Sequence, residues 1–185
     1  LRVTDPTDQP GPEMSRLLKA RPLPADPVVI EADAAEREAL AHRFGLGGID
    51  SLRAEVTLDQ KAQAIRACGV LHAAVQQVCA ISNENFPVTI SEPFDLRFVP
   101  ETVRPEPADE EEALEIELER DDLDEIEYAG ETFDLGEAVA QTLGLAIDPY
   151  AEGPGAETAR QAAGLTDEDA PRGPLAEALS ALKKD

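Results

Sequence analysis

The stretch SLRAEVTLD, residues 51–59, decides the fold because its side chains alternate strictly between polar and apolar. Successive side chains of a β-strand point to opposite faces, so a period of two places one set in a core and the other in water. The apolar set is Leu52, Ala54, Val56 and Leu58, and the polar set includes Arg53, Glu55, Thr57 and Asp59. The sequence therefore predicts a strand with one buried and one exposed face.

Two further alternating stretches follow and predict an antiparallel meander. After a turn near Gln60 to Ala62, the apolar positions fall on odd numbers, and in the next stretch they fall on even numbers. The odd set is Ile65, Ala67, Leu71, Ala73 and Val75, and the even set is Phe86, Val88, Ile90, Phe94, Leu96 and Phe98. Short connections between consecutive strands favour antiparallel pairing. We expect Gly69 and Pro93 to lie at bulges or edges, because neither suits the centre of a strand.

A helix should precede the meander, over about Ala34 to Phe44. Its start carries Asp33-Ala-Ala-Glu36, a spacing in which each acidic side chain can accept a hydrogen bond from the other residue's backbone N–H. Gly45 suits the end of this helix, since glycine readily adopts the left-handed backbone that terminates many helices. A short strand over Val28 to Ile30 should come before the helix.

A second helix should follow the meander, from about Leu135 to Ile147, after a small hairpin that turns at Ala129-Gly130. Asp134 is expected to cap this helix, with Glu137 completing a second capping box. Apolar residues recur along one face of the predicted helix. Together these elements predict an α+β fold: an antiparallel β-meander, open or barrel-like, with a few short helices.

The composition divides the chain into three regions around one domain. Residues 1–27 are rich in Pro and Asp and should form a loosely docked N-terminal segment. Residues 28–150 should form a single α+β domain, since 185 residues leave room for one sizeable core. Residues 151–185 are expected to be a flexible tail, with Leu175 to Leu182 as a candidate short helix. Within the domain, residues 101–127 hold fourteen acidic residues against two arginines, which predicts a mobile acidic loop.

The chain is strongly acidic, with a formal net charge of −23 at pH 7. Affinity for a phosphate backbone comes from lysine and arginine, so the composition argues against nucleic-acid binding by the whole surface and favours a basic partner. No stretch is long and apolar enough to span a membrane, and no secretory leader opens the chain. Because the two cysteines lack the spacing of a disulfide framework, we expect a cytoplasmic protein.

No constellation of catalytic or metal-ligating residues stands out in the sequence. A structural zinc site needs four cysteine or histidine ligands, usually as two close pairs. The candidates are Cys68, Cys79, His42 and His72, and none forms a pair at the usual spacing. A Gly-x-Ser-x-Gly nucleophile motif and a phosphate-binding loop are also missing. We therefore expect no catalytic residue, no cofactor, no metal and no small-molecule substrate.

The candidate contact residues are basic. Arg53, Lys61 and Arg66 cluster in the sequence around the first predicted hairpin, and we consider them candidate contacts for RNA or for a partner. The alternative is that they are ordinary solvated residues of a strand face. The sequence leaves both interpretations open.

Several stretches, taken in order, resemble the YceD family, the large ribosomal RNA subunit accumulation proteins of bacteria and plastids. They are EADAAEREALAHRFGL, LRAEVTL, GVLHAAVQQVCAISNENFPVTISEPFDLRFVP, an acidic insert, and TFDLGEAVAQTLGLAIDPY followed by PGA. The similarity covers about Glu13 to Ala156. It implies a non-enzymatic factor that supports accumulation or processing of large-subunit ribosomal RNA in ribosome biogenesis. The implied partner is a basic ribosomal protein or a pre-ribosomal particle, with contact to ribosomal RNA as a further implication.

The resemblance also bears on one cysteine. Many members of the family carry Cys-x-x-Cys where this chain has Cys79-Ala-Ile-Ser82. Serine is a poor zinc ligand beside a thiolate, so we interpret Cys79 and Ser82 as the remnant of that motif, with Cys79 kept for packing.

Two other functional classes remain open. One is an acidic protein-interaction module that mimics nucleic acid and is unrelated to ribosomes. The other is a redox or metal enzyme. If the chain is a ribosomal factor or an acidic interaction module, the acidic run at residues 101–127 either engages a basic partner or serves as an inert linker.

Overall fold

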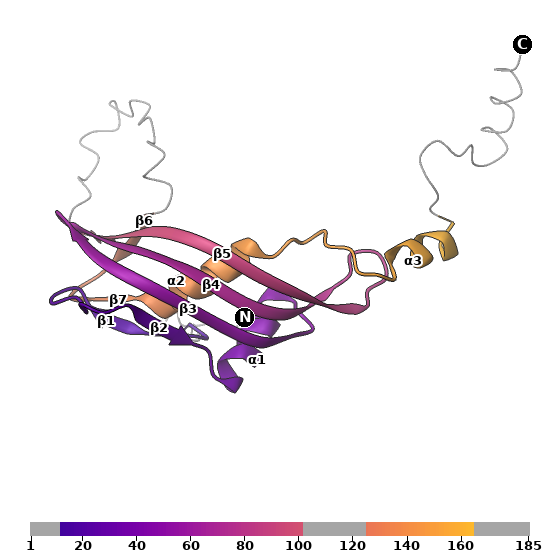
Figure 1. Cartoon of the computed structure of the whole chain (residues 1–185), viewed down its shortest axis with the longest axis horizontal. Helices are drawn as coiled ribbons and strands as arrows, with labels where there is room; N and C mark the ends of the chain where they lie inside the picture. The colour runs from indigo at the N-terminus through magenta and orange to yellow at the C-terminus, as the bar shows by residue number, and fades with distance from the viewer. Residues whose placement is uncertain (1–11, 102–124, 165–185) are drawn as a thin grey trace, which may run out of the picture. The chain divides into compact units, whose positions relative to one another are not determined.

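The computed structural model describes residues 12–101 and 125–164 (Figure 1). Its elements are β1 (Leu17–Lys19), β2 (Val28–Glu31), α1 (Ala34–Phe44), β3 (Gly48–Lys61), β4 (Ala64–Val78), β5 (Asn85–Pro100), β6 (Glu125–Tyr128), β7 (Thr132–Asp134), α2 (Leu135–Ala146) and α3 (Ala156–Ala162). The backbone contacts define two compact units. The first lies within Leu1–Gln77 and Pro87–Asp148, and the second within Val78–Phe86 and Pro149–Asp185.

The first unit is built on a five-stranded sheet in the order β2-β3-β4-β5-β6. The pairs β2-β3 and β3-β4 are antiparallel, which confirms the predicted α+β meander. β6 instead runs parallel to β5 and pairs only with Arg97–Pro100. The two outer strands, β2 and β6, do not pair with each other, so the sheet is open and the barrel-like form is not adopted.

One face of this sheet forms the core, as the alternation predicted. Leu52, Ala54 and Val56 of β3 are at most 1% exposed, and the residues between them are exposed. The odd-numbered apolar residues of β4 are buried in the same way. Helices α1 and α2 lie on the buried side of the sheet (Figure 1), and the polar side chains of β3 face away from them. We call this second side the outer face.

Gly69 occupies a different place from the one expected. It lies within β4, between β3 and β5, opposite Val56, and the only shift in the β3-β4 register falls between Ile49 and Ser51. The prediction of a bulge or edge at Gly69 was wrong. An ideal Cβ there would lie 2.4 Å from the carbonyl oxygen of Glu55 and 2.9 Å from the ring of Phe94. Glycine is needed because the backbones and this ring approach so closely.

Helix α1 begins and ends as predicted. The Asp33 side chain accepts hydrogen bonds from the N–H groups of Ala35 and Glu36, and Glu36 accepts one from Asp33, which completes the capping box. Gly45 ends the helix at φ 65°, in the left-handed region. The local signals therefore place both ends of this helix.

Helix α2 begins at the predicted cap, Asp134, but Glu137 does not complete the predicted capping box. Asp134 caps it by accepting from the N–H groups of Gly136 and Glu137. The Glu137 carboxylate pairs with Arg43 of α1 at 2.9 Å instead of completing a capping box. This ion pair joins the two helices that cover the sheet.

A second, two-stranded sheet pairs β1 with β7. The sequence did not indicate β1, which lies in the segment expected to be loosely docked. Met14 just before it is fully buried, and the backbone N–H of Arg16 donates to Asp134 Oδ1 at 2.8 Å. The hairpin expected at Ala129-Gly130 is not formed. Gly130 does turn the chain, at φ 74°, but β6 and β7 on either side of it belong to different sheets.

Some expected segments fall partly or wholly outside the described residues. Residues 102–124 of the expected acidic loop lie outside them, and residues 125–127 belong to β6 rather than to a loop. The candidate helix Leu175 to Leu182 also lies outside. Within the expected tail, the described part contains α3, which the sequence analysis missed. None of the helices in the described ranges has the length and apolar character needed to cross a membrane.

Candidate interaction surface

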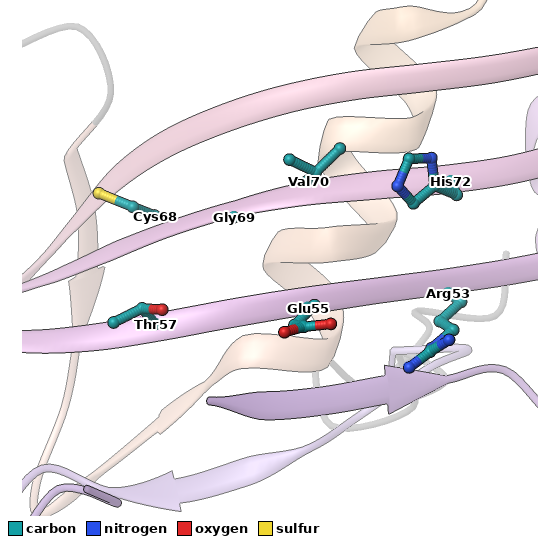
Figure 2. Close-up of a pocket in the computed structure, with 7 residues that line it drawn as sticks. All are labelled: Arg53, Glu55, Thr57, Cys68, Gly69, Val70 and His72. Atoms are coloured by element: carbon teal, nitrogen blue, oxygen red, sulfur yellow. The ribbon is translucent and has the colours of Figure 1, made fainter. Parts of the chain in front are cut away.

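A shallow hollow of about 410 Å³ lies on the outer face, where β3 and β4 run side by side. Figure 2 shows its lining: Arg53, Glu55, Thr57, Cys68, Gly69, Val70 and His72. All these residues except Gly69 have the parity that points away from the core, so the strict alternation of β3 and β4 places them together. The hollow is therefore a direct product of the sequence pattern that forms the sheet.

The β3-β4 register sets Arg53 beside His72, and the β2-β3 register sets Arg53 beside Glu31. Both Arg53 and His72 are exposed. Among the described residues, Arg53 has no ion pair, since no carboxylate lies within 4 Å of its guanidinium. An exposed, unpaired guanidinium next to an imidazole can take up a phosphate or a carboxylate. The sequence analysis considered His72 only as a candidate zinc ligand and missed its position beside Arg53.

Apolar groups flank the charged ones on the same face. Val29 of β2 and Val70 of β4 both lie opposite Glu55 and are 50% and 38% exposed. The hollow itself holds one arginine, one glutamate and one histidine, so its charge is close to zero. In a chain of net charge −23, a nearly neutral surface is where a polyanion would meet the least repulsion.

Arg66 is engaged by a carboxylate. Its Nε donates to both oxygens of Asp95, at 2.8 and 3.1 Å, and its terminal nitrogen also bonds this carboxylate. The hydrogen bonds from Arg66 lower the pKa of Asp95 to about 2, so the pair stays charged at neutral pH. The Cys68 thiol donates to Asp95 Oδ1 at 3.2 Å. Burial, and then the bond to Asp95, raise the pKa of Cys68, which keeps it a protonated, weakly nucleophilic thiol.

The three basic residues named from the sequence do not form one group. Lys61 ends β3 opposite Ala64, and Arg66 lies opposite Asp59, so these two belong to the hairpin end. Arg53 is eight residues from Lys61 along an extended strand, which separates their backbones by about 26 Å. Of the three, only Arg53 lines the hollow.

In the second unit, Cys79 and Ser82 come together in a tight turn. The sulfur of Cys79, which is 2% exposed, accepts the backbone N–H groups of Ile81 at 3.4 Å and Ser82 at 3.3 Å. The side-chain hydrogen bond from Ser82, followed by these backbone N–H groups, lowers the pKa of Cys79 to about 7. Asn83 closes the turn at φ 58°, with its N–H donating to the Cys79 carbonyl.

The described part of the chain holds no cluster of three or more His, Cys, Asp or Glu side chains arranged to bind a metal ion. The interpretation of Cys79 and Ser82 as the remnant of a Cys-x-x-Cys motif therefore stays a prediction. What the structure adds is that the turn holds the two side chains in contact.

Comparison with known proteins now gives a family. The model of the family described as "Large ribosomal RNA subunit accumulation protein YceD" matches residues 67–183, more than half of the chain. The chain belongs to the YceD family. No curated protein and no solved structure matches it.

Membership in the YceD family confirms the resemblance, although the matched range differs from the expected one. The YceD match begins within β4 and extends beyond α3, so it includes Cys79 and Ser82. Arg53 and Lys61 precede it. Strand β3, which supplies Arg53, Glu55 and Thr57 to the hollow, therefore lies outside the matched region of this YceD chain.

Proposed function

We propose that this chain is a non-enzymatic, cytoplasmic factor that supports the accumulation or processing of large-subunit ribosomal RNA. The observation that carries the proposal is the family match over residues 67–183. The outer face adds support of a second kind. It offers exposed side chains, Arg53 and His72 among them, for contact with a partner.

The proposed partner is a pre-ribosomal particle, bound through a basic ribosomal protein and through ribosomal RNA. The net charge of −23 favours the basic protein. We propose that RNA is contacted at Arg53 and His72, where an unpaired guanidinium lies in a nearly neutral hollow. Arg66 contributes less to this contact because Asp95 already neutralises it. Lys61 stays a candidate contact at the hairpin end.

The first experiment depletes the protein in its native host and measures the ratio of mature large-subunit to small-subunit ribosomal RNA. We expect this ratio to fall and to recover when the wild-type chain is restored. An unchanged ratio would refute the proposed function.

The second experiment tests the surface with two variants of equal charge change. Arg53→Glu should weaken co-sedimentation with pre-ribosomal particles and reduce its dependence on salt. Lys19→Glu, at an exposed lysine of β1 in the two-stranded sheet, is the matched control and should change both much less. If the two variants behave alike, the contact is not centred on Arg53, whatever the outcome for ribosomal RNA.

The net charge of the chain also favours the alternative of an acidic module that mimics nucleic acid. Such a module would capture basic proteins of many kinds and would not enrich pre-ribosomal particles. Sequencing the RNA that is purified together with the chain separates the two functions.

A further inference from the structure

The long strand β5 has an edge that is mostly free. β5 runs over Asn85–Pro100, and β6 pairs with it only at Arg97–Pro100. The other neighbour of β5 is β4, on the opposite side. Within the described residues, no strand pairs with Pro87–Leu96 on the β6 side, so the backbone groups pointing that way are free to bond another chain. Figure 1 shows β5 along the margin of the sheet.

Two prolines indicate which backbone groups these are. In a strand, residues of one parity direct their N–H and C=O groups to the same side. Even-numbered residues of β5 are the more buried ones on both sides of Pro93, so the alternation is kept from Pro87 to Pro93. Proline has no N–H to donate and is tolerated where the N–H side faces solvent. The free edge therefore presents the N–H groups of Thr89 and Ser91, between the two prolines.

A groove of about 250 Å³ with both polar and apolar lining lies between this part of β5 and the end of α2. Its lining includes Phe94 and Leu96 from β5 and Leu145 and Ala146 from α2. Leu145 is 89% exposed, the highest value among the exposed large apolar residues described. A free strand edge beside a groove with exposed leucine provides what strand addition needs: backbone bonds for affinity and a pocket for a side chain.

The charges around the groove are negative. Its ionisable lining residues are Glu92 and Asp95, and Asp95 is already paired with Arg66. Glu92 is exposed and has no ion pair among the described residues. The last turn of α2 contains no basic residue, so the partial negative charge of its free carbonyl groups is uncompensated there. An occupant that carries positive charge is complementary to this groove.

We propose that the free edge of β5 takes up an extended, lysine- or arginine-bearing segment of a partner protein as an added strand. Backbone groups of Thr89 and Ser91 bond the segment, one of its apolar side chains enters the groove against Leu145, and its cations face Glu92 and the end of α2. A second copy of this chain is a poorer occupant, because its own β5 would bring Glu92 against Glu92 and would carry prolines in place of donors. The inference goes beyond the proposed function, and its test needs neither RNA nor ribosomes.

The test uses the full chain and a labelled synthetic peptide, acetyl-Thr-Lys-Thr-Val-Thr-Lys-amide, whose valine and two lysines share one face of a strand, with binding followed by fluorescence anisotropy. A second peptide carries N-methyl groups on alternate backbone nitrogens, which removes strand donors and keeps the charge. We expect the N-methylated peptide to bind at least tenfold more weakly, because strand bonds supply much of the affinity. Equal binding of the two peptides would mean that charge alone attracts them and would overturn the proposal.

Variants of the protein test the site itself. Ser91→Pro removes one outward N–H and should weaken binding of the unmodified peptide about tenfold. Ser91→Ala keeps that N–H and should leave the affinity unchanged. Leu145→Ala should lower the affinity for this peptide several-fold, whereas Leu17→Ala, at an exposed leucine of β1, should not change it. Glu92→Lys should also lower the affinity for the peptide, and raising the salt concentration should reduce binding to this variant less than binding to the wild type.

Each remaining outcome is decisive. If Ser91→Pro unfolds, its N–H bonds β4 and the assignment of the free edge is wrong. If Ser91→Pro folds and binds the peptide normally, the strand is not added at β5. If sedimentation shows that the wild-type chain self-associates and Ser91→Pro does not, the occupant is a second copy and the proposal of a basic partner segment fails.

Discussion

Replacing Asp134 by alanine should destabilise the protein far more than the loss of a helix cap alone, because its carboxylate serves two segments. Oδ1 accepts the backbone N–H groups of Gly136 at 3.0 Å and Glu137 at 3.1 Å, which starts α2. The same oxygen accepts the N–H of Arg16 at 2.8 Å, and Oδ2 accepts the hydroxyl of Ser15 at 2.6 Å. The side chain thus fixes a helix and holds the N-terminal segment against it.

The magnitude follows from these contacts. Loss of an N-cap costs about 1 kcal/mol. The partly buried bond from Arg16 N–H to a charged acceptor adds roughly 1.5 to 3 kcal/mol. We expect Asp134→Ala to lower the free energy of unfolding by about 3 kcal/mol in total. Asp33→Ala is the matched control, since that carboxylate caps only its own helix and should cost about 1 kcal/mol.

Urea unfolding of the two variants measures the difference, and hydrogen exchange locates it. In the Asp134 variant, the amides of β1 and β7 should exchange faster than in the wild type, while those of β3 and β4 should exchange at rates that reflect only the global loss of stability. If Asp134→Ala and Asp33→Ala cost the same free energy, or if β1 keeps its protection, the second role of Asp134 is refuted.

Three further predictions concern other parts of the chain. Gly136→Ala should cost about 1 to 3 kcal/mol in urea unfolding, because its Cβ would lie 2.6 Å from a backbone nitrogen of the N-terminal segment. Gly144→Ala in the same helix should cost less, since its nearest neighbour at 2.7 Å is the movable end of a phenylalanine ring, and equal costs would contradict this argument. The folded pKa of Asp95, about 2, is below its unfolded value, so its pairing stabilises the fold above pH 4 and this contribution is lost as the pH falls toward 2. Arg66→Gln should abolish that part of the acid dependence, and a profile identical to that of the wild type would exclude the pair as its source. Cys79 should titrate near pH 7 when thiolate absorbance is followed in a variant without the other cysteine, and a midpoint near 9 would show that its hydrogen bonds do not form in solution.

Patterns within single strands and the antiparallel order of the meander were predictable, but the residue-by-residue register between strands was not. The alternation in residues 51–59 assigns each side chain to a face, because parity is a property of one strand. Which residue of β4 lies opposite Arg53 depends instead on where the turn between β3 and β4 falls. The turn was expected near Gln60 to Ala62, and it falls at Ala62 and Gln63, with β3 continuing to Lys61 and Ala62 at φ 48°. Alanine rarely adopts a positive φ and gives no turn signal, so the placement of Arg53 beside His72 could not be read from the sequence.

Contacts between distant segments account for the elements that the sequence analysis missed. β1 is three residues long and bonds to a strand more than a hundred residues away, so no local pattern marks it. Gly69 was assigned to a bulge by a rule about strand interiors, whereas the closeness of Glu55 and Phe94 requires a glycine there. The candidate surface was found only in part for the same reason. Arg53 was named from its charge, and the hollow around it exists only once β3 and β4 are paired.

The parallel pairing of β6 beside β5 has a consequence for how the gene can vary. Pro100 ends β5, and Glu125 enters β6 opposite Arg97, so the two ends of the connection lie about 10 Å apart along the strand and about 5 Å across it. Because the two strands are parallel, however, the chain must cross back over the sheet between them, and such a crossover takes about a dozen residues or more. The sheet therefore sets only a minimum length for the residues between them. Insertions, deletions or a fused reporter protein at this position should be tolerated by the rest of the fold, which makes it a natural site for evolutionary change and for engineering.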